Sequence, residues 1–459
     1  MKDLTQGAIG RHLLRMSAAF QLNLFAGTLL SLANIYWLGR LGADAQAAVT
    51  LAGILVMLLL SLLPIVNVGA GILIAQAVGA GHRERANAIF NEAFGAALIA
   101  SALFGAIAWT CRDRFGALIA TDPAVAGLIA RYFRWFVPSV MVQVPMFVLT
   151  SALNFTGNVR VGAVAQLGMV VVNAVLTPLL MFGRFGAAPL GIEGAGLATF
   201  LACGVALAAL LAYTVRGRTA LSLRPRTWLA RPRTLAGALK LGLPVGIEGA
   251  IAAACLSVVA WWLRPFGAHE QAAFGIGQRV FQAGLIPLLA LGQAINVLAS
   301  QNHGAGLESR VRETLRTGLR YGLTVAPLLL IAFEVAAPWI CGRFSGDAAV
   351  IAAGSVFLRI VALGLIPMSC AYAAFAVLSG MGNTRAGLCA QAVGAGLTVL
   401  VSAIASRMPG FGPPWLWAIL AATNGVQAVL GWHFVRKQLG APGGVAAAST
   451  AAFDANAAR

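Results

Sequence analysis

Long uninterrupted apolar runs are the feature that most limits what this chain can fold into. Residues 161–182 carry no charged side chain, and residues 86–110 carry a single acid, Glu92. A bilayer core needs about 20 such residues per helix. Only 10% of the 459 residues are charged, against about 25% in soluble domains. These patterns predict an all-α polytopic membrane protein, and the lack of short alternating segments disfavours an outer-membrane barrel.

Breaks rich in charge, glycine or proline divide the chain into twelve predicted transmembrane spans. The spans start near residues 13, 46, 88, 127, 161, 190, 237, 271, 316, 350, 386 and 414. The first span, residues 13–38, is too long for a cleaved signal peptide, and we expect it to remain as a helix.

Lys and Arg gather on one side of this topology when the amino terminus is placed inside. The side rich in Lys and Arg stays cytoplasmic, so we expect a bacterial inner-membrane protein with both termini in the cytoplasm. The net charge is +18, but the basic residues are spread over short loops without a soluble module. The lipid bilayer is therefore an expected partner and nucleic acid is not.

Short sequences recur along the chain at one fixed offset. AQAVGAG at residues 75–81 returns as SQNHGAG at residues 300–306, a shift of 225. The same shift relates residues 41–48 to 266–273 and residues 156–166 to 381–391. We infer two copies of a six-helix unit with the same membrane orientation. Such copies are related by a pseudo-two-fold axis along the membrane normal, as in transporters whose halves move about a central site.

The repeat divides the chain into predicted domains. They are an N-terminal six-helix lobe at residues 1–215, a cytoplasmic linker at 216–236, a C-terminal six-helix lobe at 237–439 and a disordered tail at 440–459. The linker is basic and contains prolines but no apolar run long enough to span, and the tail is rich in Ala, Gly and Ser.

The repeated Gly-Ala-Gly sequence follows the second span of each copy. Gly79, Gly81, Gly304 and Gly306 predict a hinge or a helix cap before a basic loop, because glycine ends helices and allows tight turns. A phosphate-binding loop would need a preceding strand and usually a lysine.

Taken together, these segments resemble the multidrug and toxic compound extrusion (MATE) transporters. The resemblance rests on YWLGRLGADAQAAV, AQAVGAG with SQNHGAG, LNFTGNVRVG with LSGMGNTRAG, and PLGIEGAGLAT, and it covers residues from about 10 to 437. It implies two six-helix lobes and antiport of organic cations or other amphiphilic small molecules by alternating access, coupled to protons or sodium ions. We expect proton coupling, a monomer and no cofactor.

The chain departs from the MATE pattern at acidic positions of its first half. Family members commonly carry a carboxylate in place of Asn34 and another in place of Thr177, whereas Asn173 matches the family. Asn and Thr can contact a ligand but cannot titrate. Asn23 lies about three turns before Asn34 on the same helix face. A polar stripe along the substrate pathway and hydrogen bonding between helices both remain open.

One acid, Glu248, is predicted deep in the seventh span. Ionisable residues at such depth are functional candidates, and we expect coupling or substrate contact. The alternative is a structural, protonated side chain beside Pro244. MATE members that couple through a carboxylate in this helix tend to carry it about a turn later, at Ala252. Arg279 of the eighth span is a further pathway candidate, and its pairing with Glu248 is left open.

Enzymatic and metal-binding functions find no support in the motifs. The five histidines and six cysteines form neither HExxH nor CxxC, so we expect no metal site and no catalytic residues. Two other functions stay open: a flippase or exporter of a lipid-linked or anionic substrate, and a coupling-deficient sensor with a carrier fold.

Overall fold

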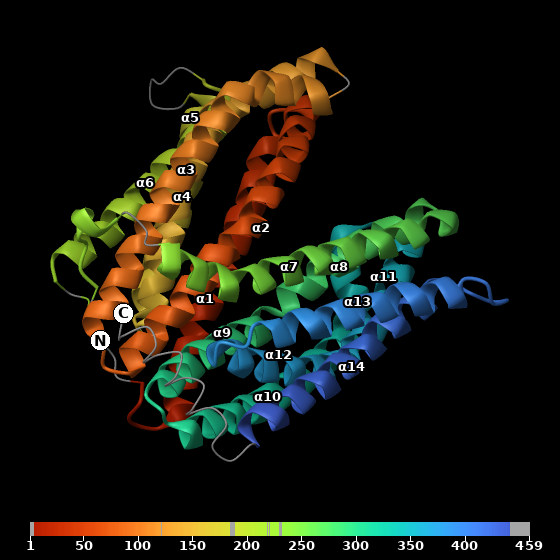
Figure 1. Cartoon of the computed structure of the whole chain (residues 1–459). Helices are drawn as coiled ribbons and strands as arrows, with labels where there is room; N and C mark the ends of the chain where they lie inside the picture. Colours follow the sequence, from red (N-terminus) through yellow and green to blue (C-terminus); the bar gives the residue numbers. More distant parts are fainter. Residues whose placement is uncertain are drawn as a thin grey trace. The chain divides into compact units, whose positions relative to one another are not determined.

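The computed structural model describes residues 4–120, 122–183, 189–217, 219, 221–228 and 232–440. It describes the backbone but not the side chains at residues 35, 43, 54–64 and 232. Every regular element in these ranges is a helix (Figure 1). The predicted tail lies, except for Gly440, outside the described residues.

The first repeat contains six helices. They are α1 (Ile9–Gly39), α2 (Ala43–Gly79), α3 (Arg83–Ile119), α4 (Pro123–Phe155), α5 (Val159–Phe182) and α6 (Ile192–Val215). The second repeat contains α7 (Pro232–Trp262), α8 (Ala268–Gly284), α9 (Ile286–Gly304), α10 (Glu308–Phe344), α11 (Ala348–Ala362), α12 (Leu365–Gly380), α13 (Arg385–Ala405) and α14 (Pro413–Leu439). Two short 3-10 helices, η2 (Pro225–Thr227) and η3 (Arg264–Phe266), lie next to α7 in the sequence.

Twelve of these segments are long enough to cross a membrane. Nine single helices in the described chain are also sufficiently apolar, and two bent pairs, α8 with α9 and α11 with α12, qualify as one span each. The remaining span is α2, whose 37 residues run continuously. The predicted all-α, twelve-span fold is confirmed, although two of the spans consist of two helices each.

The repeat is visible in the helix bounds. Adding 225 to the bounds of α3 gives those of α10, and adding it to α2 or α4 gives the outer bounds of α8 with α9 or of α11 with α12. Asp122 and Asp347, which this shift relates, both cap helices: each Oδ1 accepts from a backbone N–H two residues on, at 2.8 Å. The predicted internal repeat is confirmed at the level of single turns.

The chain folds into two compact units, which do not coincide with the repeats. One unit holds Ala18–Gly246, and the other holds Leu4–Ser17 together with the chain from Ile247 onward. The helices α1 and α7 are therefore each shared between the units. The predicted lobe boundaries describe a different division, based on the number of spans, and stay a prediction.

The linker is packed against α3 within the first unit. Asn91 Nδ2 donates to Ser222 O at 2.8 Å, and Asn91 Oδ1 accepts from the N–H of Arg224 at 2.7 Å. The carbonyl of Trp228 lies against Gly95, where any Cβ would clash, and the indole ring packs on Phe94. We call residues 221–228 the linker strap, since α3 holds both its backbone and its aromatic end.

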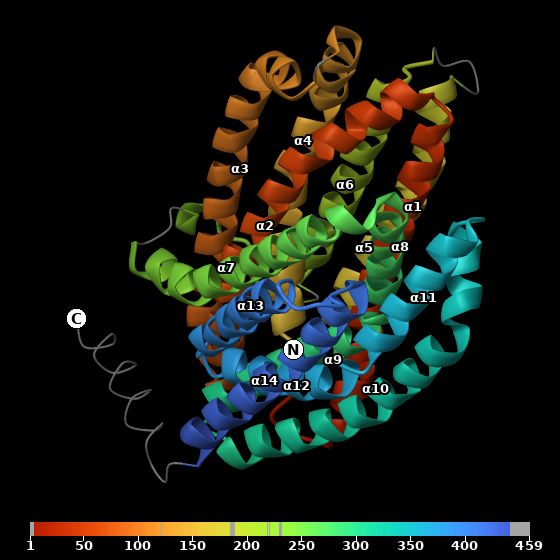
Figure 2. The ribbon, with the colours of Figure 1, turned by 90° about the vertical axis from the view of Figure 1, so that its right-hand side faces the viewer.

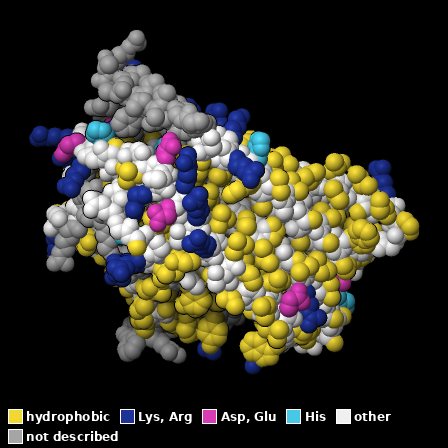
Figure 3. Space-filling view, turned by 90° about the horizontal axis from the view of Figure 1, so that it is seen from below, with side chains coloured by type: hydrophobic (Ala, Val, Ile, Leu, Met, Phe, Trp, Pro, Cys, Tyr) yellow, Lys and Arg dark blue, Asp and Glu magenta, His cyan; other side chains and the backbone are white. Residues whose placement is uncertain are grey.

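The exposed faces of the spans are apolar. On α10, Leu328, Ile331, Val335 and Trp339 recur at helical spacing and are each more than half exposed. The face in Figure 3 shows a broad hydrophobic area next to a region where Lys and Arg gather. Exposed apolar stripes of this kind suit contact with lipid, because hydrocarbon rather than water surrounds such a helix.

Candidate functional site

Glu248 lies in α7 on the side that meets α13. A Cβ placed on Gly387 of α13 would lie 2.9 Å from Glu248 Oε2, so glycine at this position makes room for the carboxylate. The Glu248 side chain is half-buried, and Tyr372 of α12 lies within its electrostatic range. Within the described part of the chain, this carboxylate forms no hydrogen bond or ion pair. A negative charge on this carboxylate would therefore have no hydrogen-bond donor or cation from the described residues to stabilise it.

Next to Glu248, α13 and α14 meet along polar side chains, which we call the polar seam. Gln427 Nε2 donates to Gln391 Oε1 at 3.2 Å, and Thr398 Oγ1 donates to Thr423 Oγ1 at 3.4 Å. Gln391 lies one turn after Gly387, the glycine that contacts Glu248, so both share one face of α13. The seam also includes Ser402, whose buried Oγ has no hydrogen-bond partner among the described residues. The polar seam therefore begins one turn beyond the glycine that contacts Glu248.

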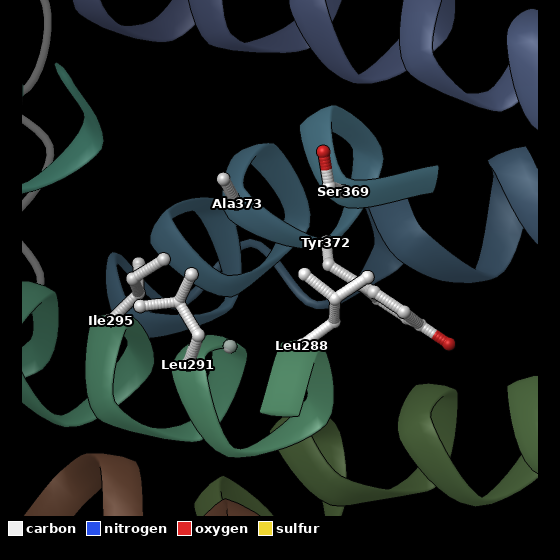
Figure 4. A pocket seen from close by; sticks show the side chains of 7 residues that line it. Leu288, Leu291, Ile295, Ser369, Tyr372 and Ala373 are labelled. Carbon is white, nitrogen blue, oxygen red and sulfur yellow. The ribbon is translucent and has the colours of Figure 1, made fainter. Parts of the chain in front are cut away.

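A shallow recess with no room for an enclosed water molecule lies between α9 and α12 (Figure 4). The residues that line it are Leu288, Leu291, Gly292, Ile295, Ser369, Tyr372 and Ala373. The Ser369 hydroxyl donates to Ile366 O at 2.8 Å, and the Tyr372 hydroxyl points away from Leu291 and Ile295. The lining is therefore mostly apolar.

Asn173 and Thr177 belong to a buried network between α5 and α6. Thr177 Oγ1 donates to Asn173 Oδ1 at 3.2 Å, and Asn173 Nδ2 donates to Thr199 Oγ1 at 3.1 Å. The Thr199 hydroxyl then donates to Ala195 O at 3.0 Å. Asn173 and Thr177 are each 1% exposed. Every hydroxyl proton in this network has an acceptor, which is the condition for burying polar groups in a membrane span.

The other predicted pathway residues are not brought into this network. Asn23 and Asn34 are half-buried in α1, and Arg279 is exposed on α8. None of the three forms a side-chain hydrogen bond or ion pair with another described residue. Accordingly, Arg279 is not paired with Glu248, a question that the sequence left open.

The predicted Gly-Ala-Gly caps have matching geometry in both repeats. Gly79 and Gly304 are the last helical residues of α2 and α9, whereas Gly81 and Gly306 have φ of 78° and 72°. The N–H of His82 donates to Ala77 O at 2.9 Å, which closes the first of these turns. Only the second glycine of each pair therefore needs the left-handed backbone that glycine adopts without strain.

Sequence reasoning missed that the repeat itself relates several of these site residues. The shift of 225 pairs Asn23 with Glu248, Asn173 with Thr398, and Thr177 with Ser402. It also missed Gly387 and the α13–α14 pairs. The signal for the polar seam was the glutamine at the same place in TGNVRVGAVAQ and MGNTRAGLCAQ, which is now seen to be Gln391 in α13. No group of three His, Cys, Asp or Glu among the described residues is arranged to hold a metal ion.

Comparison with known proteins identifies the family that the chain matches. Residues 21–179 and 244–404 match the family described as MatE. The chain is 26% identical over 307 residues to the probable multidrug resistance protein YoeA of Bacillus subtilis, a match that covers 66% of each chain. It is also 26% identical over 378 residues to a FAD transporter of Shewanella oneidensis, with 81% of each chain covered.

Solved structures show the same fold at lower identity. A MOP superfamily transporter from Pyrococcus furiosus is similar with a TM-score of 0.87 and 19% identity, covering 96% of this chain and 98% of that one. The Vibrio cholerae MATE transporter VcmN in its bent form gives 0.86 and 20%, with 94% and 97% covered. At these identities the likeness extends to the fold alone.

Proposed function

Because the chain belongs to the MatE family, we propose that it exports organic cations or other amphiphilic small molecules in exchange for protons. The family is one of membrane efflux transporters, and the twelve-span fold agrees with that function. The substrate class, the coupling ion and the role of Glu248 are our proposal. We place the chain in the bacterial inner membrane with both termini in the cytoplasm, following the distribution of Lys and Arg.

The observation that supports the proposal most is the position of Glu248. The carboxylate lies in a membrane span, packed on Gly387, with no ion pair in the described part of the chain. An isolated charge in such a place is expensive, so binding a proton removes that cost whenever the surroundings close around it. In each transport cycle Glu248 would take up a proton when exposed to one side and release it to the other.

Replacing Glu248 with Gln tests this role. In proteoliposomes with an imposed pH gradient, Glu248→Gln should still exchange labelled tetraphenylphosphonium downhill but should fail to accumulate it against a gradient. Glu334→Gln is the matched control, because Glu334 also lies in a span, α10, but is near the guanidinium of Arg359 at 3.8 Å. Full uphill accumulation by Glu248→Gln would leave Glu248 a structural residue and move the coupling elsewhere.

A second candidate, export of an anionic molecule, is favoured by one relative and one residue. The Shewanella relative that is aligned over 81% of this chain is named as a FAD transporter. Arg279 is exposed on α8 and forms no ion pair with another described residue, so it could meet an anionic group. The same proteoliposomes loaded with FAD decide between the two functions. If the protein transports FAD but no cation, and Arg279→Gln loses the FAD transport, the second candidate would replace our first proposal.

A further inference from the structure

The second repeat contains the same four residues at both of its broken spans. Gly-Leu-Ile-Pro occurs at residues 284–287, between α8 and α9, and again at residues 364–367, between α11 and α12. The first pair of helices is bent by 44° and the second by 50°. One motif therefore accompanies two bends of nearly equal size in one unit.

The motif has a direct physical reason to bend a helix. Pro287 and Pro367 lack an N–H, so the carbonyls of Ala283 and Leu363, four residues earlier, lose their helical donors and meet the proline ring. The preceding helices end with i to i−3 bonds: the N–H of Leu285 donates to Gln282 O at 3.2 Å, besides its bond to Phe281 O, and that of Gly364 donates to Val361 O at 3.0 Å. Few backbone hydrogen bonds hold the angle at either bend.

Each glycine of the motif is also contacted by a side chain from an unbroken neighbouring helix. Phe333 of α10 lies against Gly284, where a Cβ would clash with its ring. Asn424 of α14 lies against Gly364, where a Cβ would be 2.7 Å from Nδ2. The helices α10 and α14 thus run past the two bends and can support movement on either side of them.

The helices on one side of the bends are joined to each other. Asn296 Nδ2 of α9 donates to Ser379 Oγ of α12 at 3.1 Å, and Gly380 lets the end of α12 approach α9 closely. On the other side, Phe357 of α11 packs in a T-shape on Phe274 of α8, with ring centroids 5.6 Å apart. Figures 1 and 2 show α9 beside α12 and α8 beside α11.

We propose that α9 and α12 form one block that tilts against α8 and α11 about the two Gly-Leu-Ile-Pro bends. The recess of Figure 4 lies within this block, immediately after both bends. A tilt would change the distance between Tyr372, which moves with α12, and Glu248, which is packed on α13. At 1.5 Å per residue α9 is about 28 Å long, so a change of about 10° would move its far end by about 5 Å.

Distance measurements between spin labels test the block. The labels replace Gln271, exposed on α8, and Ala305, which follows α9, in the full-length protein with its six native cysteines changed to alanine. The protein is measured in vesicles of phosphatidylethanolamine and phosphatidylglycerol. We expect a broad or two-peaked distance distribution in the parent, and one narrowed and lengthened by about 3 Å in Pro287→Ala, as a straightened helix requires.

The decisive variant lies at the other bend. If α9 and α12 move together, Pro367→Ala will also narrow the distribution between α8 and α9. Pro327→Ala in the unbroken helix α10 is the matched control and should leave the distribution unchanged. A single narrow distance in the parent, or a distribution that ignores Pro367→Ala, would overturn the proposal.

Hydrogen exchange of the unaltered protein gives an independent measurement if the proline variants do not fold. Backbone amides at residues 285–289 and 363–368 should exchange faster than those at 325–331 around Pro327, because hinge amides open locally. Equal protection of these three segments would identify the bends as rigid kinks and would also overturn the proposal.

Discussion

The first repeat runs its second and fourth spans as single helices, α2 and α4, whereas the second repeat breaks both equivalent spans. Proline alone does not explain this difference, since α4 contains Pro138 and Pro145 and stays continuous. In the second repeat a glycine three residues before each proline adds backbone freedom, and a neighbouring side chain lies against that glycine. The helix breaks where a proline, a glycine three residues before it and a side chain packed against that glycine occur together. Only the second repeat has this combination in its spans.

The two repeats also differ in their polar groups. At the position where α7 has Glu248, the equivalent residue of α1 is Asn23. The α5–α6 network around Asn173 is complete, whereas the equivalent α13–α14 seam leaves the Oγ of Ser402 without a partner among the described residues. The contrast holds for these two networks and not for the whole repeats, since Asn67 and Asn154 of the first repeat also have a buried Oδ1 without a hydrogen-bond partner among the described residues.

The largest effect is expected when the acid is moved between the repeats. In Glu248→Gln we expect substrate binding to lose its pH dependence, and in the double variant Asn23→Glu, Glu248→Gln we expect that dependence to return. A carboxylate can change charge where Asn and Gln cannot, and coupling to one proton changes affinity by up to about tenfold per pH unit. Equilibrium binding of labelled tetraphenylphosphonium measures this dependence between about pH 5.5 and 8.5, a range in which buried carboxyl groups commonly gain or lose their proton.

The control for this exchange is Asn23→Gln, which changes length but adds no charge. If the double variant stays insensitive to pH, a carboxyl group at this position is not sufficient. The neighbours of Glu248, which are Gly387 and Tyr372, would then be what distinguishes the second repeat.

An intermediate effect is expected at the segments that lead into each repeat. Asn91→Leu removes two of the hydrogen bonds between α3 and the linker strap and leaves the Ser222 carbonyl and the Arg224 N–H without their partner. A loss of about 1–3 kcal/mol in unfolding free energy should follow. Purified protein should unfold at lower temperature, and trypsin should cut faster after Arg226, which is followed by Thr227, whereas Arg224 is followed by a proline that blocks cleavage.

The segment before the first repeat is held by α10, the helix equivalent to α3: the guanidinium of Arg310 donates to Gly7 O at 3.0 Å. Arg310→Leu should have a smaller effect, since part of this contact is open to solvent. A larger loss of unfolding free energy in Arg310→Leu than in Asn91→Leu would contradict this expected order of the two effects.

The smallest effect is expected at the two aspartate caps. Asp347 lies outside the spans, and the backbone N–H of Ala349, followed by nearby His269, lowers the pKa of its carboxyl below the ordinary value. His269 Nδ1 is 2.8 Å from Asp347 Oδ2, and the shift of 225 places Asp44 at the position of His269 in the first repeat. The charge of Asp347 therefore stabilises the fold above its ordinary pKa, and this contribution is lost as the pH falls through the lowered pKa.

Thermal unfolding of Asp347→Asn and Asp122→Asn between about pH 7 and pH 3 checks this, with the lower limit set near the ordinary pKa of Asp of about 3.9. Asn keeps the capping hydrogen bond, so each variant removes only the charge. We expect the Asp347 variant to melt lower than the Asp122 variant near neutral pH, with the difference shrinking below about pH 4. A difference that grows on acidification would contradict the lowered pKa.

The spans and the repeat could be predicted from the sequence because both depend on short-range patterns. Apolar length predicts a membrane helix, and one offset relates the turns around Gly81 and Gly306 in the two repeats. The environment of Glu248 could not be predicted, because its neighbour Gly387 is distant in the chain and only folding brings α13 to α7. The two bends left a signal in the repeated Gly-Leu-Ile-Pro, but Pro138 shows that such a signal needs the neighbouring side chains before it can be interpreted.

The sharing of α1 and α7 between the two units affects how the protein is made. The unit that contains Ala18–Gly246 takes in the linker strap and the beginning of α7, so it is incomplete when the ribosome has produced only the first six spans. Leu4–Ser17, the first described part to be synthesised, belongs to the unit that is finished last. The described part of the first unit is one continuous stretch, whereas the second unit joins the beginning of α1 to helices that are synthesised only after the first unit is finished.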